Sequence, residues 1–380
     1  MELYIHIPYC RQKCLYCDFA SYAGQETTMA AYVDALLTEA RSMAHYAKDT
    51  PISTVFIGGG TPSLLPPALL HRLLKGLKKL FTIPDGIEFT SEANPGTLTA
   101  QWLDTAVSCG LNRLSMGMQA RQESLLKALG RIHSHDDVIS SVSVARAGGI
   151  SNVSLDLMFG LPGQTAEMWK ETLDAALALT PQHLSCYGLI PEDGTPLKRE
   201  LDAGRLLLPD EEDERIMYDM ALDTLARNGF RQYEISNFSL PGYECRHNIG
   251  YWTRVPYIGL GASAASFLNT PGGGLRLTNP ATIHGYIAMS EANAWRRRER
   301  ISLLPADARF ESLMLGLRMN RGVSEAEFEA AHGTALEMLY GKTLRRFESE
   351  GLMLHQDGFW RLTRRGMDVQ NAILVELMDD

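Results

Sequence analysis

The chain has 380 residues, more than one hydrophobic core usually organises, so two or three domains are expected. A composition of 45% hydrophobic and 21% charged residues excludes disordered and fibrous classes, and no apolar run is long enough to predict a membrane helix. The formal net charge of -9 removes any general attraction to nucleic acid or anionic lipid, so a polyanionic partner would need a local basic patch.

Short apolar runs alternate with amphipathic stretches from residue 3 to about residue 238. The apolar runs predict six strands, at residues 3–7, 54–57, 87–91, 113–118, 152–158 and 183–189. Amphipathic periodicity predicts helices at 29–46, 68–80, 99–108, 136–147 and 166–179. A last helix follows the sixth strand, with Asp210 as its N-cap and Gly229 just beyond its end.

Repeated strand–helix units predict a parallel sheet. Six units in residues 1–238 are too few for a closed eight-unit barrel, so we expect an α/β fold with an incomplete (β/α)6 barrel that resembles part of a TIM barrel. A doubly wound open sheet is the alternative. Both architectures place ligands at the carboxyl ends of the strands.

The alternation stops after residue 238. Glycine- and proline-rich turns, including one at 270–274, predict a loop and hairpin segment over residues 239–295 that covers the barrel. Residues 296–380 predict a small winged-helix-like domain, with helices near 310–317, 325–331 and 335–350, a hairpin at 354–362 and a final helix. This domain has no excess of basic over acidic residues, so we expect a lid or a protein contact rather than nucleic-acid binding, and a solvated linker at residues 296–298.

Six cysteines without a secretory signal pattern favour a cytoplasmic protein in which a tight cysteine cluster binds metal. Cys10, Cys14 and Cys17 form a C-x3-C-x2-C motif on the loop after the first strand. Three thiolates at this spacing can hold three irons of a 4Fe-4S cluster and leave the fourth iron open. The alternative is zinc, with His6 as a fourth ligand. The other cysteines are expected to pack as small apolar residues; they are Cys109, Cys186 and Cys245.

The cysteine motif, with Tyr16 just before its last cysteine, resembles the radical S-adenosylmethionine (SAM) superfamily. The resemblance implies a partial (β/α)6 barrel in which SAM chelates the open iron. A Gly-Gly-Gly-Thr-Pro run ends the second predicted strand, and polar side chains lie at the carboxyl ends of the next three. By resemblance, the SAM contacts are Tyr4, Tyr16, Gly60, Thr61, Pro62, Glu92, Gln119, Arg131 and Asp156.

Motifs at residues 4–8, 58–62, 92–96 and 155–158 are similar to the branch that contains the oxygen-independent coproporphyrinogen III oxidases and the radical SAM haem chaperones. The oxidases carry a further cysteine two positions after the third, where this chain has Phe19. They also have an N-terminal extension of several tens of residues before the motif. Both differences favour the chaperones.

A His-Asn-x-x-Tyr-Trp motif at residues 247–252 is typical of the haem chaperones. His247 is therefore the predicted axial ligand of a haem iron, and the alternative is a histidine that fixes a loop. The resemblance implies a haem chaperone with a 4Fe-4S cluster and SAM, which transfers haem to an acceptor haemoprotein and receives electrons from a flavodoxin or ferredoxin. The competing hypotheses are a coproporphyrinogen III oxidase and, more weakly, a zinc-dependent module whose C-terminal tail contacts nucleic acid.

Overall fold

The six predicted strands form the middle of one large sheet in the computed structural model, which describes residues 1–270 and 273–378. They are β1 (Glu2–Ile7), β2 (Thr54–Gly59), β3 (Glu88–Ala93), β4 (Arg113–Gln119), β5 (Asn152–Phe159) and β6 (His183–Gly188). They pair in chain order and all run parallel. The strand predictions are confirmed, with bounds that differ by at most two residues.

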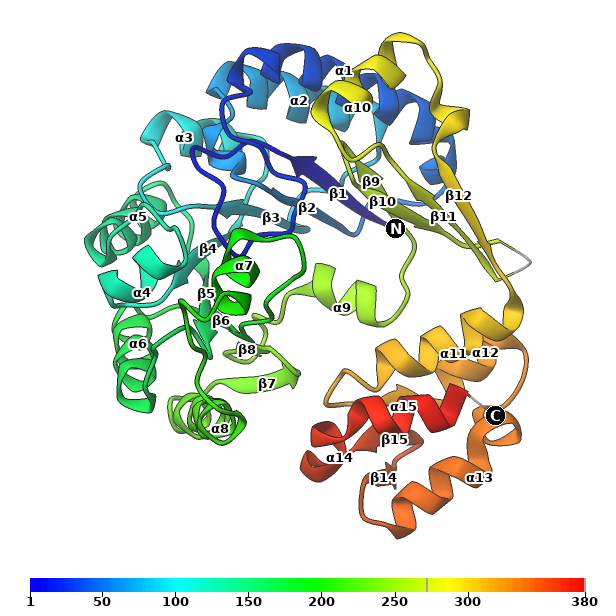
Figure 1. Cartoon of the computed structure of the whole chain (residues 1–380). Coiled ribbons are helices and arrows are strands. Elements are labelled where there is room, and N and C mark those ends of the chain that lie inside the picture. Colours follow the sequence, from blue (N-terminus) through cyan, green and yellow to red (C-terminus); the bar gives the residue numbers. More distant parts are fainter. Residues whose placement is uncertain (271–272, 379–380) are drawn as a thin grey trace.

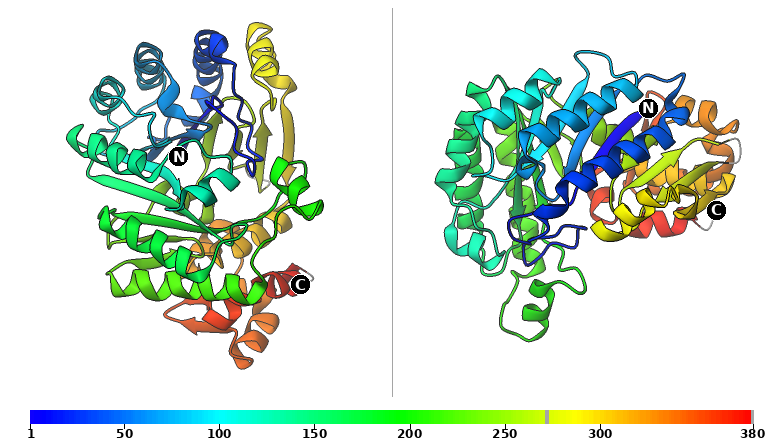
Figure 2. Two further views of the ribbon diagram at one scale, coloured as in Figure 1. Left: turned by 60° about the vertical axis from the view of Figure 1, so that its left-hand side comes forward. Right: turned by 90° about the horizontal axis from the view of Figure 1, so that it is seen from above.

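Helices cover the outer face of the curved sheet (Figures 1 and 2). The predicted helices are α1 (Met29–Met43), α2 (Pro67–Leu80), α3 (Ala100–Ser108), α5 (His135–Ala147), α6 (Ala166–Ala178) and α8 (Glu211–Arg227). Asp210 caps α8 as predicted, because its side chain accepts a hydrogen bond from the Asp213 amide at 2.8 Å. The helices α4 (Glu123–Ala128) and α7 (Pro196–Asp202) escape prediction because fewer than two turns show no helical periodicity.

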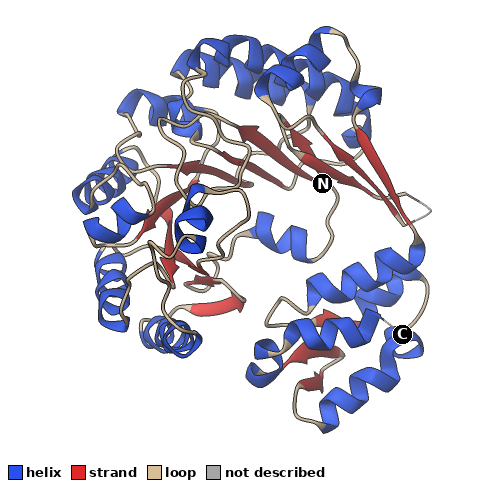
Figure 3. Cartoon of the chain, viewed as in Figure 1, coloured by secondary structure: helices blue, strands red, loops and turns tan. Residues whose placement is uncertain are grey.

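The sheet does not close into a barrel. Beyond β6 it continues through the antiparallel strands β8 (Asn237–Ser239) and β7 (Arg231–Glu234). Beyond β1 it continues through β9 (Tyr257–Leu260), which is parallel to β1, and then through antiparallel β10 (Ala265–Leu268), β11 (Gly274–Thr278) and β12 (Glu299–Leu303). The described residues thus form a twelve-stranded open sheet, shown in red in Figure 3.

Residues 239–295, expected to cover the barrel, instead extend its sheet with the three strands β9, β10 and β11. β9 supplies hydrogen-bond partners to β1, whose edge would otherwise be unpaired. The rest of the segment forms α9 (Arg246–Trp252) and α10 (Ile283–Glu291), and α10 packs on α1. Pro271 and Gly272 of the predicted turn lie outside the described residues.

The C-terminal part has its own apolar core, centred on residues such as Leu313, Leu344 and Trp360. Its elements are α11 (Pro305–Gly316), β13 (Val323–Ser324), α12 (Glu325–His332), α13 (Leu336–Ser349), β14 (Met353–Gln356), β15 (Phe359–Leu362), α14 (Arg364–Asp368) and α15 (Gln370–Met378). The predicted order of three helices followed by a hairpin is present. No helix within the described ranges is both long and apolar enough to cross a bilayer.

The basic run before this part is not wholly solvated. The run begins in the 3-10 turn η4 (Trp295–Arg297); the other such turns are η1 (Glu26–Thr28), η2 (Ala44–Ala47) and η3 (Pro62–Leu64). Just after η4, Arg298 is only 8% exposed, and its Nη1 lies 3.1 Å from Glu39 Oε1 of α1. A buried guanidinium needs such a partner, and spacing along the sequence does not reveal a carboxylate that is 259 residues away. The prediction of a solvated linker is therefore wrong at Arg298.

Candidate functional site

The three cysteines of the C-x3-C-x2-C motif lie on the loop after β1 and line one cavity of about 140 Å³, which we call the cysteine cavity. Cys10 is buried, Cys14 and Cys17 are half-buried, and all three are free thiols. The loop follows the carboxyl end of β1, so the thiols lie at the edge of the sheet where parallel-strand folds collect their functional groups. The structure thus brings the predicted ligands together.

Each sulfur has a polar neighbour. Thr61 Oγ1 donates to Cys10 Sγ at 3.6 Å, and Arg131 Nη1 donates to Cys14 Sγ at 3.5 Å. Ser21 Oγ lies 3.7 Å from Cys17 Sγ. Donors beside sulfur stabilise a thiolate ligand, and hydrogen bonds of this kind tune iron–sulfur clusters. Three soft thiol ligands with this support fit a 4Fe-4S cluster.

His6 does not complete a zinc site with the cysteines. Its Nδ1 is hydrogen-bonded to Tyr4 Oη at 2.9 Å, and its Nε2 to the Ala20 carbonyl at 2.9 Å. In the part of the chain that the structure describes, no three His, Cys, Asp or Glu side chains are arranged to hold a single metal ion. This geometry favours ligands spaced around a cluster over a Cys3His zinc site.

The other three cysteines are buried and lie on separate elements. Cys109 follows α3, Cys186 is in β6, and Cys245 precedes α9. None of them lines the cysteine cavity. The prediction that they pack as small apolar residues agrees with these positions.

The glycine run at the end of β2 presses against the cysteine loop. The Gly60 amide donates to the Ile7 carbonyl at 2.9 Å, and the Thr61 amide donates to the Tyr9 carbonyl at 2.8 Å. A Cβ at Gly60 would lie 2.7 Å from the Tyr9 carbonyl oxygen, closer than backbone packing allows. Glycine is therefore required here by the close approach of two chain segments.

Polar side chains from three strands meet at the cysteine cavity. Glu92 of β3, Gln119 of β4 and Asp156 of β5 all line it. The Gly59 amide donates to Glu92 Oε2 at 2.9 Å, and burial raises the pKa of the Glu92 carboxyl to about 7. Burial also raises the pKa of Asp156. Gln119 has a left-handed backbone, with φ of 63°, where the register of β4 and β5 shifts.

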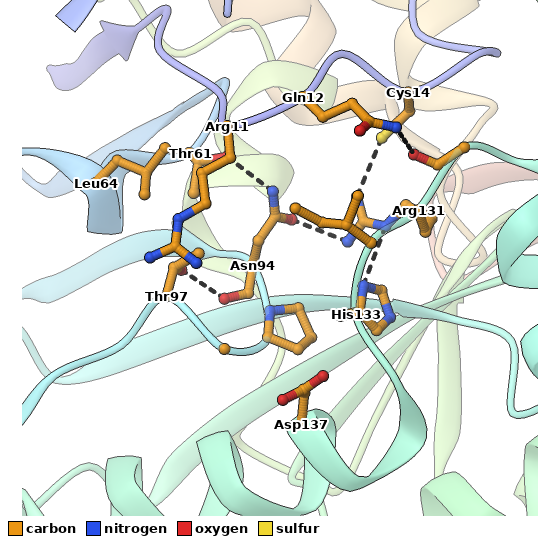
Figure 4. Close-up of a pocket in the computed structure, with 14 residues that line it drawn as sticks. Arg11, Gln12, Cys14, Thr61, Leu64, Asn94, Thr97, Arg131, His133 and Asp137 are labelled. Atoms are coloured by element: carbon orange, nitrogen blue, oxygen red, sulfur yellow. Dashed lines mark hydrogen bonds between the residues drawn. The ribbon is translucent and has the colours of Figure 1, made fainter.

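Arg131 connects the cysteine loop to these strand ends, as Figure 4 shows. Its Nη2 donates to Asn94 Oδ1 at 2.9 Å and to the Gly117 carbonyl at 2.7 Å, while Nη1 contacts Cys14. Its Nε donates to His133 Nδ1 at 3.3 Å, and burial together with this guanidinium lowers the pKa of His133 to about 4. A cation is thus fixed at the edge of the cavity.

The remaining predicted SAM contacts occupy different positions. Tyr16 and Gly60 line the cysteine cavity with the cysteines. Tyr4 lines an adjoining cavity of about 410 Å³, which shares Gly59 and Glu92 with the cysteine cavity. Pro62 is buried at the start of η3 and lines neither cavity.

Several polar residues that line the cysteine cavity were not among the predicted contacts, and Asn94 and Ser115 make the most direct hydrogen bonds to those that were. Asn94, just past β3, accepts from Arg131 and donates to Thr61 Oγ1 at 2.7 Å. Ser115 donates to Asp156 Oδ1 at 3.0 Å. The alternation of β4 contains a signal for Ser115, because it shares a strand face with Gln119 four residues later.

His247 lies at the amino ends of the parallel strands, at the opposite edge of the sheet from the cysteines. Its Nδ1 is hydrogen-bonded to the hydroxyl of Thr54, the first residue of β2, at 2.7 Å, and its Nε2 to Tyr251 Oη at 3.0 Å. The ring is 1% exposed and stacks on Phe56. Burial lowers the pKa of His247 to about 3. Both nitrogens are engaged, so this geometry favours a histidine that fixes α9, and haem ligation stays a prediction.

Glu88, the first residue of β3, secures the same helix. Its carboxylate accepts hydrogen bonds from the amides of Arg246 and His247, at 2.8 and 3.0 Å. The first amides of a helix have no carbonyl partner within the helix, and the carboxylate of Glu88 accepts hydrogen bonds from two of them in α9. The His-Asn-x-x-Tyr-Trp motif thus holds a short helix under the amino ends of the strands.

Comparison with known proteins agrees with this geometry. Residues 4–176 match the radical SAM superfamily, and residues 303–369 match the HemN C-terminal domain. The chain is 36% identical to the heme chaperone HemW of Bacillus subtilis over 97% of both chains. It is 34% identical to the heme chaperone HemW of Escherichia coli over 98% of this chain and 97% of that protein.

A solved structure shares the whole fold. Coproporphyrinogen III oxidase (HemN) from Escherichia coli, a radical SAM enzyme, aligns with a TM-score of 0.85 over 99% of this chain and 89% of that chain, at 22% sequence identity. Identity this low supports the fold alone. Identity above 30% over nearly the full length carries the closer relationship, and the chain therefore belongs to the HemW family of the radical SAM superfamily.

Proposed function

We propose that this chain is a cytoplasmic haem chaperone that holds a 4Fe-4S cluster and SAM, binds haem, and transfers the haem to an acceptor haemoprotein. The observation that carries the proposal is the convergence of three thiols and the strand-end polar groups on one cavity, in a chain that aligns over 97% of its length with a protein named heme chaperone. The two features together support a chaperone that depends on the cluster.

Cys10, Cys14 and Cys17 would hold three irons, and the fourth would be left for the amine and carboxylate of SAM. When bound, the reduced cluster supplies one electron, which can cleave the sulfonium of SAM. The Gly59 amide keeps the Glu92 carboxylate turned into the cavity, where it can accept hydrogen bonds from SAM. Arg131 and Asp156 flank the same space with opposite charges.

The nine predicted SAM contacts are proposed with two kinds of role. Those that line the cysteine cavity or the adjoining cavity would touch SAM directly; they are Tyr4, Tyr16, Gly60, Glu92, Gln119, Arg131 and Asp156. Thr61 donates to Cys10, and Pro62 begins the turn that fixes Thr61. These two would act through the position of the cysteine loop.

Metal analysis of anaerobically purified protein tests the cluster. We expect about four irons and four sulfides per chain in the wild type. C14S should lose most of the iron, and C109A, which removes a buried thiol outside the cavity, should retain it. Zinc in place of iron would contradict the proposal.

An oxidase is the second candidate, because the fold aligns with a coproporphyrinogen III oxidase at a TM-score of 0.85. At the position where the oxidases carry their further cysteine, this chain has Phe19, whose side chain is 61% exposed. An anaerobic assay with SAM, a reductant and coproporphyrinogen III separates the two functions. We expect no vinyl product; vinyl product with stoichiometric 5′-deoxyadenosine would establish the oxidase.

The electron donor would approach the exposed basic residues of the cysteine loop, Arg11 and Lys13. Both lie within four residues of Cys14. Flavodoxins and ferredoxins are small carriers of the right chemistry, and an acidic one would be attracted to these charges. The rate of cluster reduction should then fall as the salt concentration rises.

Haem ligation by His247 would require its hydrogen bonds to Thr54 and Tyr251 to break. A haem titration of H247A tests this role. A changed Soret band and a weaker haem affinity would support ligation. Unchanged haem binding with lower protein stability would assign His247 to the attachment of α9.

A further inference from the structure

Asn94 lies where hydrogen bonds join two of the three predicted cluster ligands. It follows β3 directly and lines both the cysteine cavity and a neighbouring cavity of about 120 Å³. The side chain is half-buried, and both ends of its amide have a partner. Figure 4 shows this amide between Thr61 and Arg131.

The backbone at Asn94 is fixed by a tight turn. The Thr97 amide donates to the Asn94 carbonyl at 3.1 Å across the sequence Asn94-Pro95-Gly96-Thr97, and Gly96 has a φ of 75°. Proline in the second place and a left-handed glycine in the third are typical of a type II turn. Thr97 Oγ1 donates to the same carbonyl at 2.5 Å, and the Gly96 amide donates to Ser141 Oγ at 2.9 Å. The side chain of Asn94 therefore extends from a well-anchored backbone.

The chemistry of the two partners fixes the orientation of the amide. An arginine can only donate, so the atom of Asn94 that lies 2.9 Å from Arg131 Nη2 must be the oxygen. The nitrogen then faces Thr61 Oγ1 at 2.7 Å and donates to it. This contact uses a lone pair of the hydroxyl and leaves its single proton for Cys10 Sγ, at 3.6 Å.

These contacts form one continuous chain between two cysteines. It runs from Cys10 through Thr61, Asn94 and Arg131 to Cys14. On one side the amide nitrogen donates to the hydroxyl, and the hydroxyl donates to sulfur. On the other side the amide oxygen accepts from Nη2 of the guanidinium and thereby turns Nη1 toward Cys14 Sγ, at 3.5 Å. One asparagine thus orients the donors to two sulfurs.

We propose that Asn94 is a positioning residue that raises the reduction potential of the cluster by directing the donors of Thr61 and Arg131 to two ligand sulfurs. Reduction adds negative charge to a cluster, and hydrogen bonds to its sulfurs stabilise that charge. In the described residues the Asn94 side chain has no hydrogen bond to a cysteine, so it acts through its two neighbours. The inference rests on the proposed 4Fe-4S cluster and concerns how the chain tunes it.

N94D reverses one hydrogen bond with almost no change in shape. A carboxylate still accepts from Arg131 but cannot donate to Thr61, so the hydroxyl proton of Thr61 turns to the carboxylate and away from Cys10. We expect a more negative midpoint potential in an EPR redox titration of the full-length protein with its cluster. The added charge would lower the potential as well, so this effect has to be separated from the loss of the donor.

T61V separates the two effects. It removes the hydroxyl without adding charge and should itself make the midpoint more negative. In the T61V background, N94D can add only the effect of its charge, so it should lower the midpoint less than it does in the wild type. Equal shifts by N94D in the two backgrounds would overturn the proposal, and so would a wild-type midpoint in T61V.

N112D is the matched control. Asn112 precedes β4, and its amide also has both ends engaged: Oδ1 accepts from the Phe89 amide at 3.0 Å, and Nδ2 donates to the Ile87 carbonyl at 2.7 Å. These contacts lie at the amino ends of β3 and β4, away from the cysteines. N112D should keep the wild-type midpoint. A shift equal to that of N94D would mean that added charge alone explains the result and would contradict the proposal.

N94S tests the same role without any new charge. Its short hydroxyl cannot reach both partners, so we expect a more negative midpoint at unchanged iron content. Folded N94S and N94D that both lack iron, beside N112D that retains it, would make Asn94 a requirement for cluster assembly and refute a role in tuning. Absence of iron from the wild type would overturn the proposed cluster itself. A wild-type cluster whose midpoint is the same in every Asn94 variant would overturn only the role of Asn94.

Discussion

Arg131 Nη1 donates a hydrogen bond to Cys14 Sγ at 3.5 Å, although the two residues are 117 positions apart in the chain. The same guanidinium is held by Asn94 and by the Gly117 carbonyl. The cysteine loop is thereby joined to the ends of β3 and β4. An uncharged side chain at position 131 cannot make all of these contacts at once.

R131Q should keep the cluster but alter its properties. Loss of a hydrogen bond to a cluster sulfur lowers the reduction potential, so the midpoint should become more negative. The Kd for SAM should rise about tenfold, because a charge-assisted contact at the edge of the cavity is removed. Redox titration by EPR and SAM binding measure both effects. R121Q changes an exposed arginine after the same strand, and an equal effect there would contradict the assignment.

The strand ends were the most predictable part of the site. Glu92, Gln119 and Asp156 are polar residues within or at the end of runs of apolar and small residues, and parallel strands bring such residues to one edge. Ser115 was not predicted although it shares a strand face with Gln119, because a small serine inside a strand attracts less attention than a larger polar side chain. Asn94 was not predicted, because its role depends on a hydrogen bond from Arg131, which lies on a loop far away in the sequence.

Two other positions could not be predicted from the sequence, because long-range packing decides them. The motif that contains His247 does not reveal whether this histidine lies at the amino or the carboxyl ends of the strands. Only the folded structure shows it at the amino ends, where it is hydrogen-bonded to Thr54 at the start of β2. The partner of Arg298 is equally remote, since Glu39 lies on α1. Local spacing predicts elements well but carries no information on such pairs.

G60A should destabilise the cysteine loop. Its new Cβ would meet the Tyr9 carbonyl oxygen at 2.7 Å, and forced backbone shifts of this kind cost about 1–3 kcal/mol. We expect lower iron content and a lower midpoint of urea unfolding. G341A is the control, because a Cβ there meets only ordinary contacts with Glu337 in a helix. Equal stability of the two variants would contradict the close-packing argument.

R298M should be among the most destabilising single changes outside the site. It would leave Glu39 buried without its cation, and breaking a buried ion pair costs about 3–5 kcal/mol. Urea unfolding of the full-length protein measures the loss. K170M breaks the exposed pair between Lys170 and Asp174 and should change the free energy of unfolding by less than about 1 kcal/mol. A small effect of R298M would show that the buried pair adds little.

The free energy of unfolding should depend on pH through Glu2, the first residue of β1. Its side chain is 2% exposed, its Oε2 has no hydrogen-bond partner in the described residues, and His247 Nδ1 lies 3.9 Å from that oxygen. Burial raises the pKa of the Glu2 carboxyl from 4.5 to about 8. Between these values the folded protein keeps a proton that the unfolded chain has released.

The contribution of Glu2 to stability is therefore present below pH 4.5 and is lost as the pH rises toward 8. The loss for one such group approaches about 1.4 kcal/mol per pH unit. E2Q cannot ionise, so its free energy of unfolding should exceed that of the wild type by a margin that grows from pH 5 to pH 8. Urea unfolding at several pH values measures this margin, and E123Q, an exposed carboxyl, should show none. Parallel pH profiles for E2Q and the wild type would mean that Glu2 is already ionised in the folded protein at neutral pH.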